Sequence, residues 1–445
     1  MAKISVRFSE PVGPMKPMHG VNNGPLTCNF TCDARALFRE AGIPYSRLHD
    51  TEYPFGSGEF VDVPCIFKDF ERDPDDPTAY NFALTDLYLK AIEEAGTKII
   101  YRLGVTIEHN PVKVHIWPPK DNLKWARICE HIIRHYNEGW ADGFHMGIEY
   151  WEIWNEPNHC KDLKMWGGTA EEFAELYATA AEHLKKCFPD CRIGGPAFSS
   201  PDSEFVQNFF RALTKDGRRP PMDFYSWHGY VDTIEKAVER SRMAERVLAQ
   251  YGYTGAEHIY DEYNYVKTWS DMGVNVAVIQ NLPGAAFTAA MMAAMQNTCV
   301  SKLCYYDAQM KMAGSWCGLF ERGRGKRVNG GMNGLTPRKP YFAFKAFNEV
   351  YKCGTQRALE SDDDRLYAVA AYDGTQGALL ISSYADPDEC PEVKEVSVSV
   401  EGLAGKTASV YVLDESTSLE KVASFPAGDF SWQMKPYTVL LIRFA

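Results

Sequence analysis

The chain has 445 residues, of which 45% are hydrophobic and 24% charged, and its net charge is −12. This composition is that of an ordinary folded protein with a large core and argues against a disordered chain. The acidic balance argues against a nucleic-acid surface or an anionic membrane as partner, since both attract clusters of lysine and arginine. No apolar stretch is long enough for a membrane span and no signal peptide is seen, so a cytoplasmic protein is expected unless a signal was removed.

Short apolar runs alternate with longer helical patterns from residue 15 to residue 350, which is typical of a parallel sheet wrapped by helices. The expected strands are residues 19–21, 45–48, 98–103, 147–153, 192–194, 223–227, 258–260 and 302–306. The expected helices are residues 79–95, 123–137, 170–187, 234–251, 284–296 and 341–351, and the long loop 52–77 is expected over the rim. Eight strands over roughly 300 residues predict an α/β fold, a (β/α)8 or TIM barrel spanning residues 15–350.

The pattern changes after the last of these helices. Short alternating segments follow at residues 366–372, 377–384, 395–401, 408–413 and 438–444. They predict antiparallel strands of an accessory C-terminal β-sandwich domain. Residues 4–8 are expected to add a strand to it, so that the accessory domain comprises residues 1–14 plus 351–445.

The expected strand at residues 147–153 is followed by a carboxylate among aromatic and amide neighbours, in Trp154-Asn155-Glu156-Pro157-Asn158. Barrel enzymes place their reactive groups at the C-terminal ends of strands, which is where Glu156 should emerge. Aromatic surroundings such as Trp154 would favour the protonated form that a general acid needs. Asn155 offers an amide for a sugar 2-hydroxyl, a contact that strengthens as positive charge develops on the ring.

A second carboxylate, Glu262, ends a later apolar run in Tyr260-Asp261-Glu262-Tyr263-Asn264. The two glutamates can meet only if the fold returns the chain to one rim, as a barrel does. Retaining cleavage of a glycosidic bond needs such a pair, one acid to protonate the leaving oxygen and one carboxylate to attack the sugar. Glu156 is therefore the expected acid/base and Glu262 the expected nucleophile, with Tyr230 as a hydrogen-bond donor that keeps Glu262 ionised.

These residues resemble glycoside hydrolase family 39, a family of retaining (β/α)8 glycosidases that includes β-xylosidases and α-L-iduronidase. The resemblance maps the family's acid/base onto Glu156 after Asn155, its nucleophile onto Glu262, its histidine onto His228 and its second-strand arginine onto Arg47. The closing pattern of the family's barrel appears as Gly334-Leu335 and Lys339-Pro340-Tyr341. The chain departs from the family at Asp261, where threonine is common, and at Tyr306-Asp307, where a tryptophan is more usual. Both changes touch the pocket that recognises the sugar.

Further substrate contacts are expected around this pair. Arg47 is expected to hold Glu262 ionised. His228 is expected to bind the nucleophile or a sugar hydroxyl, and Asp307 to help recognise the sugar. Candidates for binding the innermost sugar are His19 and His49, and candidates for stacking on sugar faces are Trp316, Tyr265 and Trp269. The basic segment 321–327 is interpreted as a solvated loop, with approach to an acidic sugar as the alternative.

The sequence thus predicts a retaining exo-glycoside hydrolase of β-xylosidase-like type that acts on a small carbohydrate without metal or cofactor. Arabinosidase, galactosidase, glucosidase and uronidase specificities stay open, because single hydroxyl or carboxyl groups distinguish these sugars. A catalytically silent carbohydrate-binding protein on the same scaffold and a metal-dependent hydrolase built around the histidines are the alternatives. Assembly into a homo-oligomer is possible, and the sequence does not decide it.

Overall fold

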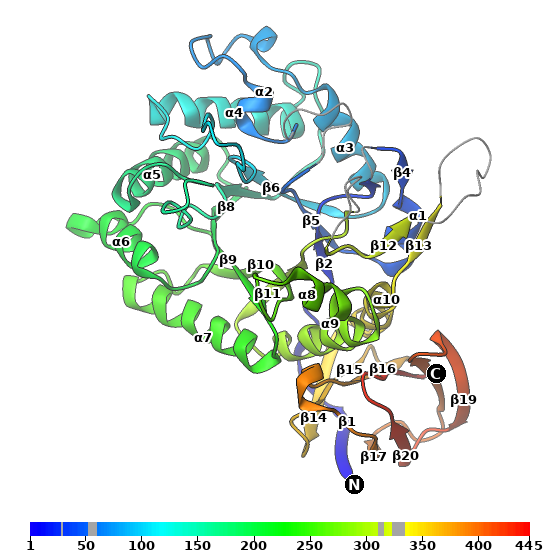
Figure 1. Ribbon diagram of the computed structural model, residues 1–445. Coiled ribbons are helices and arrows are strands. Elements are labelled where there is room, and N and C mark those ends of the chain that lie inside the picture. The colour runs from blue at the N-terminus through cyan, green and yellow to red at the C-terminus, as the bar shows by residue number, and fades with distance from the viewer. Residues whose placement is uncertain (28–29, 52–59, 310–315, 323–333) are drawn as a thin grey trace.

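The computed structural model of the chain describes residues 1–27, 30–51, 60–309, 316–322 and 334–445, which form a closed barrel of eight parallel strands and a separate curled sheet (Figure 1). Each barrel strand pairs with the next along the chain, and the last pairs with the first. The predicted (β/α)8 barrel is confirmed. Its strands are β2 (Gly20–Asn22), β5 (Tyr45–Arg47), β6 (Lys98–Leu103), β7 (Tyr150–Ile153), β8 (Arg192–Phe198), β9 (Phe224–Val231), β10 (Glu257–Tyr265) and β11 (Val300–Tyr305).

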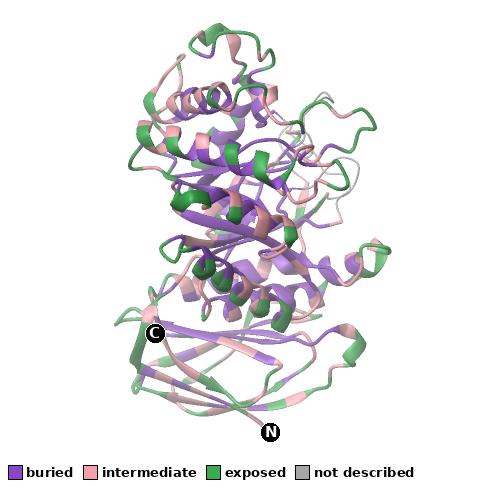
Figure 2. Cartoon of the chain, turned by 90° about the vertical axis from the view of Figure 1, so that its left-hand side faces the viewer, coloured by how far each residue is buried: buried purple, intermediate pink, exposed green. Residues whose placement is uncertain are grey.

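A layer of helices surrounds the barrel, and buried residues follow the inner strands while exposed residues lie on the outer helix faces (Figure 2). The sequence analysis missed the short helices α1 and α8, because seven or eight residues give too few turns for a clear period. It also missed α6, although the buried Val206, Phe209, Phe210 and Leu213 recur at helical spacing. The helices of this layer are α1 (Arg35–Ala41), α3 (Ala83–Glu94), α4 (Asn122–Glu138), α5 (Ala170–Cys187), α6 (Glu204–Leu213), α7 (Ile234–Tyr251), α8 (Met272–Ile279), α9 (Leu282–Met295) and α10 (Lys339–Tyr351).

Smaller elements decorate the loops. They are helix α2 (Val63–Ile66) and the strand pairs β3 (Leu26–Thr27) with β4 (Cys32–Asp33) and β12 (Phe320–Arg322) with β13 (Leu335–Pro337). Three turns of 3-10 helix span Pro77–Ala79, Lys215–Gly217 and Pro387–Glu389. Of the expected rim loop 52–77, residues 52–59 lie outside the described residues.

The accessory domain is a nine-stranded curled sheet that encloses its own apolar core. Strand β1 pairs with β14 on one side and β17 on the other, so both termini lie in this sheet (Figure 1). Strands β14, β19 and β20 were missed in the sequence because few of their side chains are buried, and β19 and β20 are the two edge strands of the sheet. In chain order the strands are β1 (Ala2–Pro14), β14 (Thr355–Ser361), β15 (Leu366–Tyr372), β16 (Gly377–Ser383), β17 (Lys394–Glu401), β18 (Thr407–Leu413), β19 (Ser418–Pro426), β20 (Phe430–Met434) and β21 (Val439–Phe444).

Helix α9 joins the two parts and is buried almost all round. The backbone oxygen of Ala286 accepts a hydrogen bond from Ser382 of the accessory sheet at 2.8 Å, and the ring of Phe287 packs against that of Tyr384. Contact on both sides explains its apolar sequence. Among the described helices, none is long and apolar enough to cross a bilayer alone; α8 and α9 reach that length and composition only as a pair bent by 75°.

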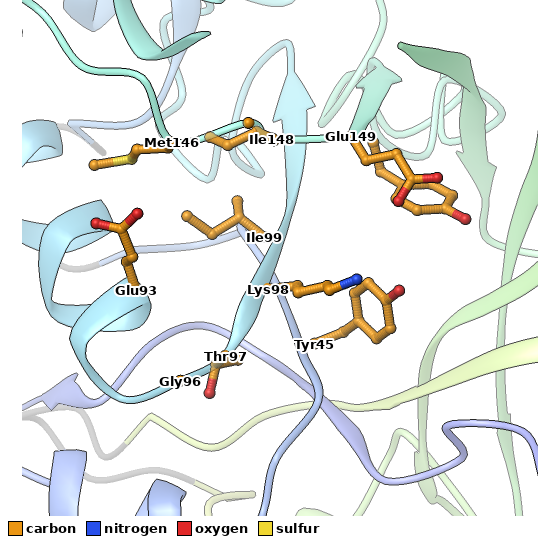
Figure 3. A pocket seen from close by; sticks show the side chains of 11 residues that line it. Tyr45, Glu93, Gly96, Thr97, Lys98, Ile99, Met146, Ile148 and Glu149 are labelled. Atoms are coloured by element: carbon orange, nitrogen blue, oxygen red, sulfur yellow. The ribbon is translucent and has the colours of Figure 1, made fainter. Parts of the chain in front are cut away.

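The N-terminal end of the barrel is closed by a buried lysine. Lys302 Nζ lies 2.8 Å from the hydroxyl of Tyr150, over the rings of Tyr45 and Tyr150, and is paired with Glu257. A pocket of about 280 Å³ opens beside this cluster, lined by residues such as Tyr45, Lys98 and Glu149 (Figure 3). This pocket lies at the strand starts, at the opposite end from Glu156 and Glu262.

Candidate functional site

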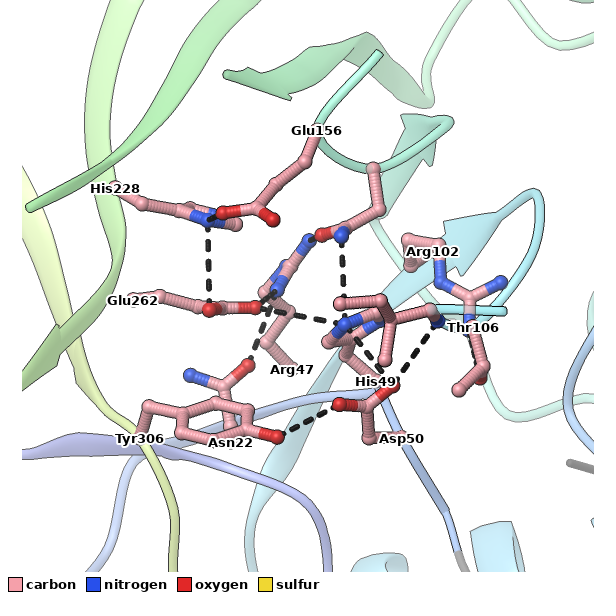
Figure 4. A network of polar contacts seen from close by, with 12 residues as sticks. Asn22, Arg47, His49, Asp50, Arg102, Thr106, Glu156, His228, Glu262 and Tyr306 are labelled. Atoms are coloured by element: carbon pink, nitrogen blue, oxygen red, sulfur yellow. Dashed lines mark hydrogen bonds and ion pairs between the residues drawn. The ribbon is translucent and has the colours of Figure 1, made fainter. Parts of the chain in front are cut away.

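The C-terminal ends of the barrel strands bring the two predicted glutamates together (Figure 4). Glu262 lies on β10, and Glu156 follows β7. One carboxylate oxygen of each lies within 4.8 Å of the other and of a ring nitrogen of His228. Since 106 residues separate the two glutamates in the sequence, the barrel alone accounts for their meeting.

A tight turn after β7 aims Glu156 at the barrel axis. Both Trp154 and Glu156 have positive φ angles, +75° and +43°, a conformation that non-glycine residues rarely adopt. The Glu156 N–H donates to the backbone oxygen of Ala197, and the Trp154 indole N–H to that of Met165 at 2.8 Å. The expectation that Trp154 surrounds Glu156 is wrong, because its ring packs against aromatic rings outside the strands, Trp125, Trp166 and Phe173. Trp154 anchors the turn instead.

Arg47, at the end of β5, is the central cation of the site. Its side chain is fully buried. Nη1 lies 2.6 Å from Glu262 and 3.2 Å from Asn22, and Nη2 lies 2.6 Å from the amide oxygen of Asn155. Nε lies 2.7 Å from Glu152 and 2.9 Å from Asp261. Arg47 therefore contacts Glu262 as expected, and it also fixes side chains from three other strands.

Glu262 has three donors around its carboxylate. The Tyr230 hydroxyl donates at 2.6 Å, Arg47 at 2.6 Å, and His228 Nδ1 lies 3.4 Å away. Burial raises the pKa of Glu262 to about 7, although the positive charges of His228 and Arg47 act in the opposite direction. The ionised form is thus available at neutral pH and is held in one orientation by charged and neutral donors.

His228 lies between the two glutamates. Its Nδ1 lies 2.7 Å from Glu156, and its Nε2 lies 3.6 Å from Asp261. Burial alone would lower the pKa of His228, but the carboxyl groups of Glu262, Asp261 and Glu156 raise it to about 10. His228 is therefore a cation at neutral pH; it donates from Nδ1 to Glu156, and its charge attracts Glu262 and Asp261.

A chain of polar contacts continues from Asn155 toward the rim (Figure 4). The Asn155 amide nitrogen lies 3.3 Å from His49, whose Nε2 also lies 3.2 Å from Asp50 and 3.9 Å from Glu262. Asp50 in turn accepts a hydrogen bond from Tyr306 at 2.8 Å. Because Arg47 occupies the amide oxygen of Asn155, the amide N–H groups of Asn155 are the ones left to meet a substrate.

Asp307 and Trp316 lie on the same side of the site. Asp307 is buried and accepts from Asn23 at 3.2 Å. The ring of Trp316 lies 5.9 Å from that of Tyr230 and 5.9 Å from that of Trp269, which is 61% exposed. Beside Tyr230 and Trp269 a groove of about 500 Å³ opens, lined also by Lys236, Arg240 and Lys267. Residues 323–333, with most of the basic segment 321–327, lie outside the described residues.

Two expected contacts are wrong. His19 precedes β2 and lies at the other end of the barrel, where its ring packs against Phe347 and Tyr351 of α10. Burial lowers the pKa of His19 to about 3, so it is a neutral core residue. Tyr265 is also buried, and its hydroxyl donates to Asp386 in the accessory domain at 2.8 Å, so its ring is no stacking platform.

Sequence reasoning missed two charged residues of the site. Glu152 was not singled out, and Asp261 was noted only as a departure from the family pattern, yet both are fully buried against Arg47. The available signal was an acid in the middle of an apolar run, since a buried strand accepts a carboxylate only if a partner is built for it.

Two groups of described residues have ligand atoms spaced closely enough for a metal ion, Glu130 with His183 and Cys187, and Glu156 with His228 and Glu262. In the second group His228 Nδ1 already lies 2.7 Å from Glu156, at hydrogen-bond distance, and 3.4 Å from Glu262. The donor set therefore fits hydrogen bonding between His228 and the carboxylates better than coordination.

Comparison with known proteins places the chain in one family. A sequence profile described as "Glycosyl hydrolases family 39" matches residues 35–297. A protein named "Beta-xylosidase" from Caldicellulosiruptor saccharolyticus is 25% identical over 299 residues, which cover 60% of this chain and 56% of that one. Another "Beta-xylosidase", from Geobacillus stearothermophilus, is 27% identical over 191 residues, 40% of this chain and 36% of that one. The matches thus span about half or less of these relatives.

A solved structure of a glucosidase from Croceicoccus marinus superposes with a TM-score of 0.79 and 22% identity, covering 100% of this chain and 99% of that one. At this identity the likeness shows that the whole chain shares the fold of that protein.

Proposed function

Because the chain belongs to glycosyl hydrolase family 39, we propose that it is a retaining exo-glycoside hydrolase of β-xylosidase-like specificity. The observation that carries this proposal is the meeting of Glu156 and Glu262 at the C-terminal ends of β7 and β10, with oxygens within 4.8 Å. Retaining enzymes hold their two carboxyl groups about 5–5.5 Å apart and inverting enzymes about 6.5–9.5 Å. The short spacing supports retention.

In the first step Glu262 attacks the anomeric carbon while Glu156 protonates the leaving glycosidic oxygen. Arg47 and Tyr230 fix the attacking carboxylate, each at 2.6 Å. His228 Nδ1 donates to Glu156 at 2.7 Å and lies 3.4 Å from Glu262, so its positive charge stabilises the negative charge on whichever of the two acids is ionised. The bond to the leaving group breaks as the covalent glycosyl–Glu262 ester forms.

In the second step Glu156, now ionised, takes a proton from a water molecule that attacks the same anomeric carbon. The ester bond to Glu262 breaks and the sugar leaves with its original configuration. Asn155 is placed to donate from its amide to the sugar 2-hydroxyl, and Arg47 and His49 hold that amide in orientation.

The retaining route predicts a defined product. Proton NMR during cleavage of a nitrophenyl β-xyloside should show the β-anomer first, with the α-anomer appearing only by mutarotation. First release of the α-anomer would rule out double displacement.

Sugar specificity is the finer part of the proposal and rests on the two β-xylosidases similar to this chain. The fold neighbour from Croceicoccus marinus carries the name glucosidase, which makes β-glucosides the leading competitor. A panel of nitrophenyl β-xyloside, β-glucoside, β-galactoside, α-arabinofuranoside and α-iduronide separates these possibilities. We expect the highest kcat/KM on the β-xyloside; binding of sugars without turnover on any member would favour a carbohydrate-binding protein instead.

The charge of Glu262 predicts how the rate depends on pH. Its pKa is raised to about 7 mainly by burial, and only the ionised carboxylate attacks. The value of kcat/KM should therefore fall as pH drops through about 7, and a profile flat down to pH about 5 would contradict the assignment.

A further inference from the structure

Two buried carboxyl groups beneath the catalytic pair take no part in the proposed steps. Glu152 on β7 and Asp261 on β10 have fully buried side chains. Both point an oxygen at Nε of Arg47, at 2.7 and 2.9 Å. This nitrogen carries a single hydrogen, so two carboxyl oxygens, one from β7 and one from β10, share one donor.

Their other oxygens lack donors. Among the described residues, Glu152 Oε1 and both carboxyl oxygens of Asp261 have no hydrogen-bond partner in good geometry; their polar neighbours are Arg47, His228 at 3.6 Å from Asp261, and the Ser226 side chain beside Glu152. Buried carboxylate oxygens without donors are costly. A proton placed between the two groups would supply the missing donor, because a carboxylic acid donates to a neighbouring carboxylate.

The charges of the site lead to the same conclusion. Arg47 and His228 are two cations, and four acids surround them: Glu152, Glu156, Asp261 and Glu262. In the resting state of the proposed mechanism Glu156 is protonated and Glu262 is ionised. One proton shared by Glu152 and Asp261 leaves two negative charges and two positive charges. This balance gives the lowest electrostatic free energy in a protein interior that excludes water.

We propose that Glu152 and Asp261 hold one proton between them and act as a positioning pair with a single negative charge, which keeps Arg47 and His228 charged under the catalytic glutamates. The proposal rests on the proposed function only for the protonation of Glu156. It goes beyond it by giving a role to Asp261, where family members often have a threonine.

The surroundings of the pair decide which group carries the proton. Burial, and the neighbouring charge of Asp261, raise the pKa of Glu152 to about 8. Burial also acts to raise the pKa of Asp261, but Arg47 and His228 outweigh it and the pKa is lowered. The other groups that interact electrostatically with the pair are Ser226 and Tyr225 from β9 and Cys304 from β11. The proton therefore belongs on Glu152, with Asp261 ionised.

Isosteric amide variants test the shared proton through the acid limb of the kcat/KM profile, which is the fall in kcat/KM at low pH. Glu152→Gln keeps a neutral group that still donates to Asp261, so the midpoint of this limb should stay within about 0.2 pH units of the parent's. Asp261→Asn lets Glu152 ionise in its place, so the limb should move little. The double variant leaves no anion opposite Arg47 and His228, which then favour ionised Glu262, and the limb should move down by about one pH unit. The proposal would be overturned if the shifts of the acid limb in the two single variants added up to the shift in the double variant. Additive shifts would indicate that Glu152 and Asp261 each carry a full negative charge.

Infrared spectroscopy tests the proton without turnover. Glu156→Gln replaces one protonated acid by a neutral amide and so keeps the charge of the resting site. Near neutral pH the C=O stretch of a buried protonated carboxyl should be stronger in this variant than in Glu156→Gln/Glu152→Gln, because partly protonated Glu262 contributes to both spectra. Equal bands in the two variants would overturn the shared proton, whereas a stronger band in the first variant, together with a parent protein that cleaves no glycoside, would overturn the proposed function alone. Thermal unfolding of each variant confirms that it is folded.

Discussion

A buried cation at each end of the barrel, Lys302 at one and Arg47 at the other, is paired with acids in a different way. At the N-terminal end Lys302 lies over two tyrosine rings and is paired with a single acid, Glu257. At the C-terminal end Arg47 is paired with three acids, Glu152, Asp261 and Glu262. Both cations lie inside the same ring of strands, and β10 supplies an acid to each.

The difference shows where the fold keeps its chemistry. Glu257 balances the charge of Lys302, and the surrounding tyrosine rings fill the end of the barrel. That end therefore has a structural role. At the other end acids outnumber cations, which leaves carboxyl groups whose protonation state can change during a reaction. A surplus of acids around a buried cation therefore distinguishes the reactive end from the structural end.

The largest effect should come from Glu262, one of the three acids of β10. Glu262→Gln removes the nucleophile and should lower kcat by about 10⁴-fold or more. Glu257→Gln, on the same strand at the other end, should leave kcat within about twofold when assayed well below its unfolding temperature, since it touches no substrate. Steady-state kinetics on a nitrophenyl β-xyloside measures kcat of both variants. An equal loss of kcat in the two variants would contradict the assignment of the chemistry to the C-terminal end.

The two cations should differ in what they contribute to stability. Arg47→Met leaves three buried acids without their common partner and should cost about 3–5 kcal/mol. Lys302→Met leaves Glu257 with hydrogen bonds from Ser301 and Tyr150, at 2.7 and 2.9 Å, and should cost only about 1–2 kcal/mol. Urea unfolding gives both free energies, and a larger loss for Lys302→Met would reverse the comparison.

Two buried histidines at opposite ends should give opposite pH trends. The folded pKa of His228 is raised to about 10, so its stabilising charge is fully present below pH about 6.5 and is lost as pH rises toward 10. The folded pKa of His19 is lowered to about 3, so the unfolded chain binds the extra proton and stability is lost as pH falls from about 6.5 toward 3.

Urea unfolding of His228→Gln and His19→Gln at about pH 5, 7 and 9 measures these trends. The stability gap between the parent and His228→Gln should shrink toward alkaline pH. The gap between the parent and His19→Gln should shrink toward acidic pH. Parallel slopes for both variants would show that the two histidines share one protonation state.

The sequence allowed the strand ends to be predicted well, and with them the meeting of the two proposed catalytic glutamates. The segments around Glu156 and Glu262 each follow an apolar run, and parallel strands in a barrel carry their ends to one rim. The same rule placed Arg47 and His228 correctly beside them. The position of a polar side chain directly after a buried strand can thus be predicted from the local sequence pattern and the barrel topology.

Side-chain direction could not be predicted in this way. His19 differs from His49 only in lying before its strand instead of after it, and an error of two residues in a strand boundary moves a side chain to the other end. Trp154 follows the same strand as Glu156, but a positive φ turns its ring outward. Glu152 was hidden because its partners come from β5 and β10, which no local pattern connects.

The smallest effect should come from the exposed rim of the reactive end. Trp269 is 61% exposed and lies 5.2 Å from the ring of Tyr230, so a sugar beyond the cleaved bond can stack on it. Trp269→Ala should raise KM for a xylo-oligosaccharide by about fivefold, since such stacking contributes about 1 kcal/mol, with kcat within about twofold. Tyr265→Phe is the matched control, because its buried hydroxyl only joins Asp386 and KM should not change. A fall in kcat at constant KM for Trp269→Ala would instead show that this ring acts on the catalytic pair through Tyr230.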